Sequence, residues 1–180
     1  TSDLFYPDLI ILDATLTYTL NQKWTASCGF DTLAHAIDGY TVKQLICVPN
    51  DYYDTLALKA IELTGKSLRQ AYAIPQNYEA RKDMLVASDL AGLMLSAGTG
   101  ATHGLANMLS KYYHVPHGES VGMLLPYVME YNMIASPERF RKVAEALGID
   151  TAGMTDMEAG HAAVDEVKQL IRDVHLPYVC

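Results

Sequence analysis

Apolar residues recur every three or four positions along most of this 180-residue chain, which is the period of helices that bury one face. Together with residues that cap and end helices, this pattern predicts about seven helices. They begin at Thr25 or Ser27, at Asn50, near Asn77, at His103, at Glu119 with His117 at its head, at Ser136 and near Asp156, and end near Tyr40, Pro75, Leu95, Tyr113, Asn132, Leu147 and Asp173. Gly65 is expected to weaken the second of them.

The one β-like pattern lies before these helices. A short apolar run, Leu9–Leu12, is followed by alternating threonines from Thr15 to Thr19. So short a run cannot form a sheet alone, so a partner strand would have to come from elsewhere. We therefore predict an all-α helical bundle over residues 21–180, with at most a short strand in the leading segment, residues 1–20. No repeat or composition break marks a second domain.

The composition excludes some classes of function. Half of the residues are hydrophobic and 19% are charged, as in ordinary globular domains, and the net charge of −8 repels phosphate backbones. We expect no nucleic-acid partner. No apolar run is long enough to span a membrane, and the first residues, TSDLFYPD, lack the basic-then-apolar layout of a signal peptide. We therefore expect a cytoplasmic protein with no membrane partner.

The three cysteines agree with a reducing compartment. Cys28, Cys47 and Cys180 are odd in number and show no CxxC spacing, so free thiols are expected. Small buried hydrophobic residues are the simplest interpretation of all three. Cys28 stands three residues before Asp31, but a thiolate ligand there is disfavoured.

Four residues in two short stretches have the chemistry of a metal site. Asp31 and His35 stand four positions apart in GFDTLAHAIDGY, so a helix would place both on one face. His103 and His117 lie fourteen positions apart in HGLANMLSKYYHVPHG. Imidazoles suit iron, zinc and nickel, and a carboxylate helps to neutralise the cation. On spacing alone, a four-ligand site and an unrelated set of core side chains are about equally favoured.

Other residues near these stretches have simpler interpretations. The Gly-rich stretch Ser96–Gly104 lacks the Lys-Ser or Lys-Thr pair and the preceding strand of a phosphate-binding loop, so a tight turn that delivers His103 is favoured. His114, His161 and His175 are interpreted as surface or satisfied core histidines.

The two stretches resemble the helices that carry the metal ligands in the iron-containing (group III) alcohol dehydrogenase family. The flanking stretches LDATLTYTL and GMLLPYVMEYN agree with it, and the resemblance covers nearly the whole chain. It implies the fold of the C-terminal domain that this family shares with dehydroquinate synthase. Residue by residue, it implies that Asp31, His35, His103 and His117 hold the metal. The fourth ligand, His35, favours the alcohol dehydrogenase branch over the glycerol dehydrogenase and dehydroquinate synthase branches.

The resemblance also implies an activity. In this family the metal, usually Fe2+ and sometimes Zn2+, polarises the substrate oxygen while hydride passes to or from a nicotinamide. We therefore expect the metal-binding catalytic domain of an NAD(P)-dependent dehydrogenase that interconverts small primary alcohols or diols and aldehydes. A homodimer is expected, as is usual in the family. The catalytic and cofactor-binding residues are not assigned.

Two departures from the family pattern bear on this expectation. Asn107 stands where the family often has a second histidine of an HxxxH pair, and Asp38-Gly39 stands where the family more often has Glu-Ala. The chain also shows no GGGS-like phosphate loop, so NAD(P) is expected only with a separate nucleotide-binding domain. Either the chain is a fragment, or its partner domain is supplied separately, or it stands alone; a fragment is the favoured interpretation. A non-catalytic metal-binding domain and a helical structural domain with empty histidines remain as alternatives.

Overall fold

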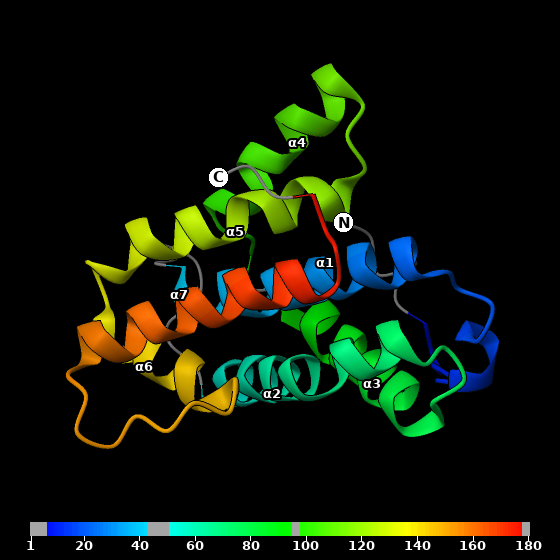
Figure 1. Cartoon of the computed structure of the whole chain (residues 1–180), viewed down its shortest axis with the longest axis horizontal. Helices are drawn as coiled ribbons and strands as arrows, with labels where there is room; N and C mark the ends of the chain where they lie inside the picture. The colour runs from blue at the N-terminus through cyan, green and yellow to red at the C-terminus, as the bar shows by residue number, and fades with distance from the viewer. Residues whose placement is uncertain (1–6, 43–50, 95–97, 178–180) are drawn as a thin grey trace.

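The computed structural model describes residues 7–42, 51–94 and 98–177, and within these ranges it contains α-helices and no strand. The helices are α1 (Gln22–Thr41), α2 (Asp51–Ala73), α3 (Tyr78–Leu93), α4 (Ala101–Tyr113), α5 (His117–Met133), α6 (Pro137–Ala146) and α7 (Asp156–Asp173) (Figure 1). The prediction of an all-α bundle is thus confirmed. The predicted cap at Asn50 and the predicted end of the third helix near Leu95 lie outside the described residues.

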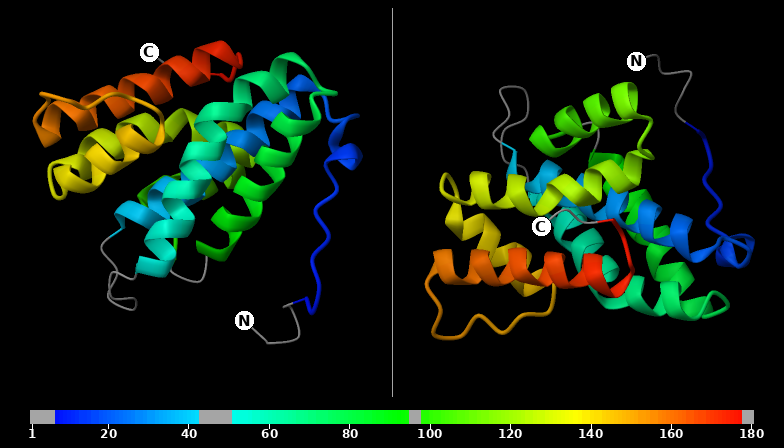
Figure 2. Two further views of the ribbon diagram at one scale, coloured as in Figure 1. Left: turned by 90° about the horizontal axis from the view of Figure 1, so that it is seen from below. Right: turned by 45° about the horizontal axis from the view of Figure 1, so that its top comes forward.

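The leading segment does not form the strand that its apolar run suggested. Residues 9–12 have no regular structure and are 42–80% exposed, and the segment runs away from the bundle in both views of Figure 2. Thr15 and Thr17, two of the alternating threonines, lie in a 3₁₀ helix, η2 (Ala14–Thr17). Asp13 caps this helix, because its carboxylate accepts a hydrogen bond from the Thr15 backbone N–H at 2.9 Å. This local cap outweighs β-propensity where no partner strand pairs with the segment.

The first long helix begins earlier than predicted. Asn21, and not Thr25 or Ser27, is its N-cap, since the Asn21 side chain accepts a hydrogen bond from the Trp24 backbone N–H at 3.0 Å. Thr25 and Ser27 lie buried inside α1. Asparagine is among the most favourable N-cap residues, which explains why the helix begins before Thr25.

Helix α1 is the centre of the bundle. It contacts all of α2 to α6, and its residues Phe30, Leu33 and Ile37 are at most 1% exposed. Figure 1 shows it crossing the middle of the molecule, with α4 and α5 on one side and α2 on the other. Each fully buried side chain of this size stabilises the fold by about 1.5–3 kcal/mol. The core therefore fixes the rotation of α1, and with it the direction of its polar side chains.

The expectation that Gly65 weakens the second helix needs correction. Helix α2 runs through Gly65 without a break, where an added Cβ would lie 3.1 Å from the Leu147 side chain, so the glycine allows close packing. Most of helix α5 is buried, but Tyr131 near its end is 79% exposed. One face of α5 packs against α1, α4 and α7, and the other faces outward.

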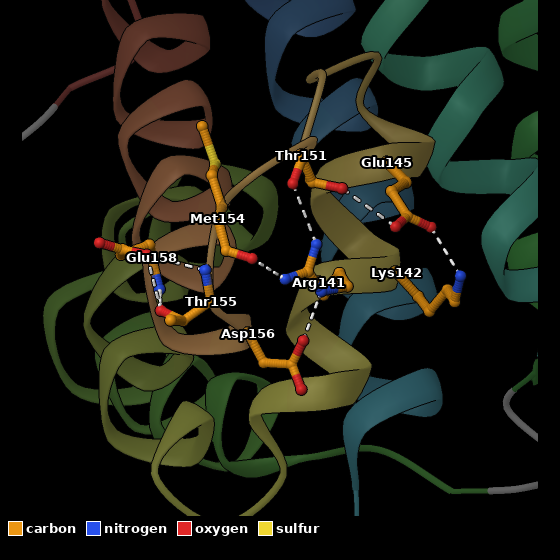
Figure 3. A network of polar contacts seen from close by, with 8 residues as sticks. All are labelled: Arg141, Lys142, Glu145, Thr151, Met154, Thr155, Asp156 and Glu158. Atoms are coloured by element: carbon orange, nitrogen blue, oxygen red, sulfur yellow. Dashed lines mark hydrogen bonds and ion pairs between the residues drawn. The ribbon is translucent and has the colours of Figure 1, made fainter.

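Arginine side chains tie distant parts of the bundle together. Arg69 of α2 bonds Glu166 and Asp173 of α7, and Arg141 of α6 reaches over the loop before α7. In Figure 3 the Arg141 guanidinium donates to the backbone carbonyls of Thr151 and Met154 and pairs with Asp156. These contacts hold α7 against α2 and α6. Within the described residues, no helix is both long and apolar enough to cross a membrane.

Candidate metal centre

Helix α1 supplies one face of the candidate site. Asp31 and His35 stand one turn apart, and the His35 Nδ1 atom lies 3.8 Å from the Asp31 Oδ1 atom. Asp38 follows at the next turn of the same face and is 2% exposed. In a helix whose other buried positions are mostly apolar, this polar stripe is the chemical feature to be explained.

Helix α4 places His103 in its first turn. The His103 ring is 4% exposed and stacks on His35 with ring centroids 4.1 Å apart. Its Nε2 atom lies 3.6 Å from Asp31 Oδ1. The donor atoms of Asp31, His35 and His103 all lie within 4.8 Å of one another, close enough to share one cation.

Helix α5 begins at His117, as the proline before it and the glycine after it suggested. Pro116 is the N-cap, and Gly118 packs so closely on α1 that an added Cβ would lie 2.1 Å from the Ser27 carbonyl oxygen. Only glycine permits this approach. It brings His117 Nε2 to 3.3 Å from Asp31 Oδ1, while the His117 side chain stays 41% exposed.

Two buried polar atoms of the site, which lie 3.6 Å from each other, form no hydrogen bond. Asp31 Oδ1 and His103 Nε2 are the buried side-chain atoms, within the described ranges, that have no hydrogen-bond partner. A buried polar atom that stays unpaired costs about 1–3 kcal/mol, so native proteins rarely leave one. Both atoms point into the same cluster. A divalent cation satisfies a carboxylate oxygen and imidazole nitrogens together, so the residues fit such an ion.

Behind His103, Asp38 forms a network that the sequence interpretation missed. One carboxylate oxygen accepts from the Thr102 hydroxyl at 2.7 Å, and the other lies 3.0 Å from His103 Nδ1. Space for the carboxylate depends on Gly100, where an added Cβ would lie 2.7 Å from Asp38 Cγ. The signal in the sequence was the spacing of Asp31, His35 and Asp38, which repeats one helix face.

The electrostatics of the cluster favour a cation. Burial raises the pKa of Asp31, but the neighbouring imidazoles outweigh it and hold that pKa below its ordinary value. Burial lowers the pKa of His35, which keeps its ring neutral and able to act as a ligand. Burial also lowers the pKa of His103, but Asp31 and Asp38 outweigh it and raise the pKa to about 9. The site thus attracts positive charge.

The structure therefore brings three of the predicted ligands, Asp31, His35 and His103, into one cluster, and places His117 against Asp31 at its edge. Their binding of a metal stays a prediction. His114, His161 and His175 are exposed, and none is part of the cluster found among the described residues.

Cys28 is also outside that cluster. It is an exposed free thiol, contrary to the expectation of a buried one, and it borders a cavity of about 210 Å³ between α1 and α3. Cys47 and Cys180 lie outside the described residues.

Comparison with known proteins gives one consistent family. Residues 25–178 match the model of the Fe-containing alcohol dehydrogenase family, C-terminal. The chain is 37% identical over 172 residues to the 1,3-propanediol dehydrogenase of Citrobacter freundii. The aligned region covers 95% of this chain and 43% of that protein. The chain therefore spans less than half the length of the curated relatives it matches.

Solved structures agree with this comparison. A crystal structure of 1,3-propanediol oxidoreductase superimposes with a TM-score of 0.88 at 36% identity, covering 92% of this chain and 42% of that one. The sulfoacetaldehyde reductase of Bifidobacterium kashiwanohense, solved in complex with NAD+, gives 0.86 at 32% identity, covering 98% and 44%. The fold predicted from sequence resemblance is thus shared with proteins of known structure.

Proposed function

Because this chain belongs to the iron-containing alcohol dehydrogenase family, we propose that it is the metal-binding part of a dehydrogenase that interconverts small primary alcohols or diols and aldehydes. The observation that carries the proposal is the convergence of three imidazole nitrogens on one carboxylate oxygen, Asp31 Oδ1, at 3.3–3.8 Å. Two of the atoms in this cluster, Asp31 Oδ1 and His103 Nε2, are buried and form no hydrogen bond.

The four side chains have distinct tasks in this proposal. Asp31 supplies the negative charge, and the neutral forms of His35, His103 and His117 supply lone pairs. When bound, Fe2+ or, as an alternative, Zn2+ supplies a Lewis acid that polarises the oxygen of an alcohol or aldehyde. The protein fixes where that polarisation occurs, because the ligands stand on three helices, α1, α4 and α5, of one packed core.

The site is open on one side, which gives a substrate access. His117 is 41% exposed at its side chain, and two apolar residues of α4, Leu105 and Met108, are 52% and 56% exposed. Within the described residues, these apolar side chains do not close the site against water. We propose that a nucleotide-binding domain covers this side, brings NAD(P) to the substrate and excludes water from the reacting atoms.

The share of the relatives that this chain covers also supports the proposal. The chain spans 43% of a 1,3-propanediol dehydrogenase and 44% of a reductase whose solved structure contains NAD+. These shares leave room in the relatives for a cofactor-binding part. A homodimer and a cytoplasmic location stay predictions, as do the choice of metal and the exact alcohol.

The experiment joins this chain to the part of the Citrobacter freundii relative that it does not match, and measures Fe2+-dependent reduction of NAD+ with 1,3-propanediol. We expect turnover in the joined protein and none in its His117→Ala variant or in the 180-residue chain alone. Robust turnover by the chain alone would refute the need for a cofactor domain. A joined protein that folds and binds Fe2+ but shows no turnover would contradict the proposed activity.

A further inference from the structure

Asp38 lies on the side of His103 that faces away from the candidate metal position. Asp38 is 2% exposed. One carboxylate oxygen accepts a hydrogen bond from the Thr102 hydroxyl at 2.7 Å. The other lies 3.4 Å from the His103 backbone nitrogen and 3.0 Å from His103 Nδ1. Two of these donors belong to one residue, His103. Asp38 therefore fixes both the backbone and the ring of that histidine.

The chemistry of a carboxylate then decides where the His103 proton stands. An ionised carboxylate only accepts hydrogen bonds, so the hydrogen between Asp38 and His103 belongs to Nδ1. A neutral imidazole carries one proton, which leaves a lone pair on Nε2. That Nε2 atom is buried, forms no hydrogen bond and lies 3.6 Å from Asp31 Oδ1.

We infer that Asp38 is a positioning residue of the metal centre, which keeps the His103 proton on Nδ1 so that Nε2 is free to bind the cation. The inference rests on the proposed metal-binding function and assigns a role to a residue that is not itself in the donor cluster. Ligating histidines commonly donate their second ring N–H in this way, and loss of the acceptor typically lowers metal affinity by about 10–100-fold.

Gly100 provides a second, independent route to the same contact. It is the N-cap of α4, and a Cβ added there would lie 2.7 Å from Asp38 Cγ and 2.9 and 3.0 Å from its oxygens. Gly100→Ala should therefore displace the Asp38 carboxylate without removing its charge. Gly104→Ala is a matched control in the same helix, because an added Cβ there meets no atom within 4 Å.

The test measures the affinity of the chain for Zn2+ alone, by competition with a chromophoric chelator. Asp38→Asn keeps the shape of the side chain but replaces one acceptor oxygen with a donor, and we expect about 10–100-fold weaker binding. Gly100→Ala should weaken binding in the same direction, and Gly104→Ala should match the wild type. Circular dichroism confirms that each variant is folded.

A further variant separates this role from a purely structural one. Thr102→Val removes a hydrogen bond that ties Asp38 to α4 but leaves the contact with His103 Nδ1 in place. If Asp38 only anchors α4 to α1, Thr102→Val and Asp38→Asn should weaken Zn2+ binding equally. That result, or wild-type affinity in Asp38→Asn, would overturn the inference while leaving the proposed metal site intact.

A measurement on the metal-free chain tests the inference even if the chain binds no Zn2+. Two-dimensional ¹H–¹⁵N spectra of the histidine rings, recorded above the His103 pKa of about 9, report which nitrogen carries the proton. In the wild type we expect the His103 proton on Nδ1, and in Asp38→Asn a shift toward Nε2. A wild-type proton on Nε2 would overturn the inference. No Zn2+ binding together with a proton on Nδ1 would instead remove the proposed function.

Discussion

The Nε2 atom of His117 lies 3.3 Å from the Oδ1 atom of Asp31, although the two side chains belong to α5 and α1. His35 and His103 place a nitrogen 3.8 and 3.6 Å from the same oxygen. One carboxylate oxygen is therefore the common neighbour of three imidazoles. Either protons on those rings or a cation between them must balance the charge of Asp31.

Gly118 sets how closely α5 approaches α1, and replacing it should disturb the site. In Gly118→Ala the added Cβ would lie 2.1 Å from the Ser27 carbonyl oxygen, so one helix backbone must move. We expect a loss of about 1–3 kcal/mol in the free energy of unfolding, measured with urea. We also expect weaker Zn2+ binding, because the adjacent His117 moves with α5.

The control for this variant is Gly92→Ala in α3, where an added Cβ meets no atom within 4 Å. Alanine favours the helix more than glycine does, so this variant should be as stable as the wild type or more stable. Equal stability and equal Zn2+ affinity in Gly118→Ala and Gly92→Ala would show that the close contact of α5 with α1 does not position His117.

The stability of the metal-free chain should depend on the charge of His103. An unfolded histidine titrates near pH 6.5, whereas Asp31 and Asp38 outweigh burial and raise the folded pKa of His103 to about 9. Protonated His103 therefore stabilises the fold fully below about pH 6.5, and this contribution is lost as the pH rises through about 9. We expect a loss on the order of 1–3 kcal/mol across this window.

Urea unfolding in the presence of a chelator, at pH 6.5 and 9.5, measures this loss. His103→Gln carries no charge at either pH and corrects for the thiols, tyrosines and lysines that also titrate at high pH. The wild type should lose more stability than His103→Gln over the same interval. Parallel losses in the two proteins would contradict the charge assigned to His103.

Arg141 should be important for stability and unimportant for metal binding. Its guanidinium bonds two backbone carbonyls, of Thr151 and Met154, and the Asp156 carboxylate (Figure 3). Arg141→Met leaves those carbonyls without this donor, and we expect about 1–3 kcal/mol less stability in urea unfolding. Zn2+ affinity should not change, since the cluster stands on α1, α4 and α5.

Lys142→Met is the matched control for Arg141→Met. Lys142 is the next residue of α6 and pairs with Glu145 on the surface, with the two side chains 55% and 37% exposed. Such exposed pairs contribute about 0.2–1 kcal/mol or less. If Lys142→Met destabilised the chain as much as Arg141→Met does, the loop contacts of Arg141 would not be what secures α7.

Local signals in the sequence were enough to locate most of the helices. Asn77 caps α3, Ser136 precedes Pro137 at the start of α6, and α7 begins at Asp156, as predicted. These positions combine a capping residue or a proline with a periodic apolar run, so short-range chemistry decides them. Gly65 misled for the opposite reason, since its small size serves a contact with Leu147 that is distant in sequence.

In the candidate site, too, local contacts could be predicted from the sequence and contacts between distant helices could not. The pairing of Asp31 with His35 follows from helix geometry alone, whereas the meeting of His103 and His117 with Asp31 depends on the packing of three helices. Asp38 was overlooked because an acidic residue late in an amphipathic helix usually faces solvent. Its burial is a property of the α1–α4 contact, which includes the fit of its carboxylate against Gly100.

The most direct test of the central claim is an anaerobic titration of the chain with Fe2+ and with Zn2+, followed by elemental analysis. We predict one bound metal per chain in the wild type and in His161→Ala, whose side chain lies on an exposed position of α7. Binding should be lost in His103→Ala and strongly weakened in His117→Ala. No metal in the wild type, or full binding in both site variants, would contradict the claim that Asp31 and the three histidines form a metal centre.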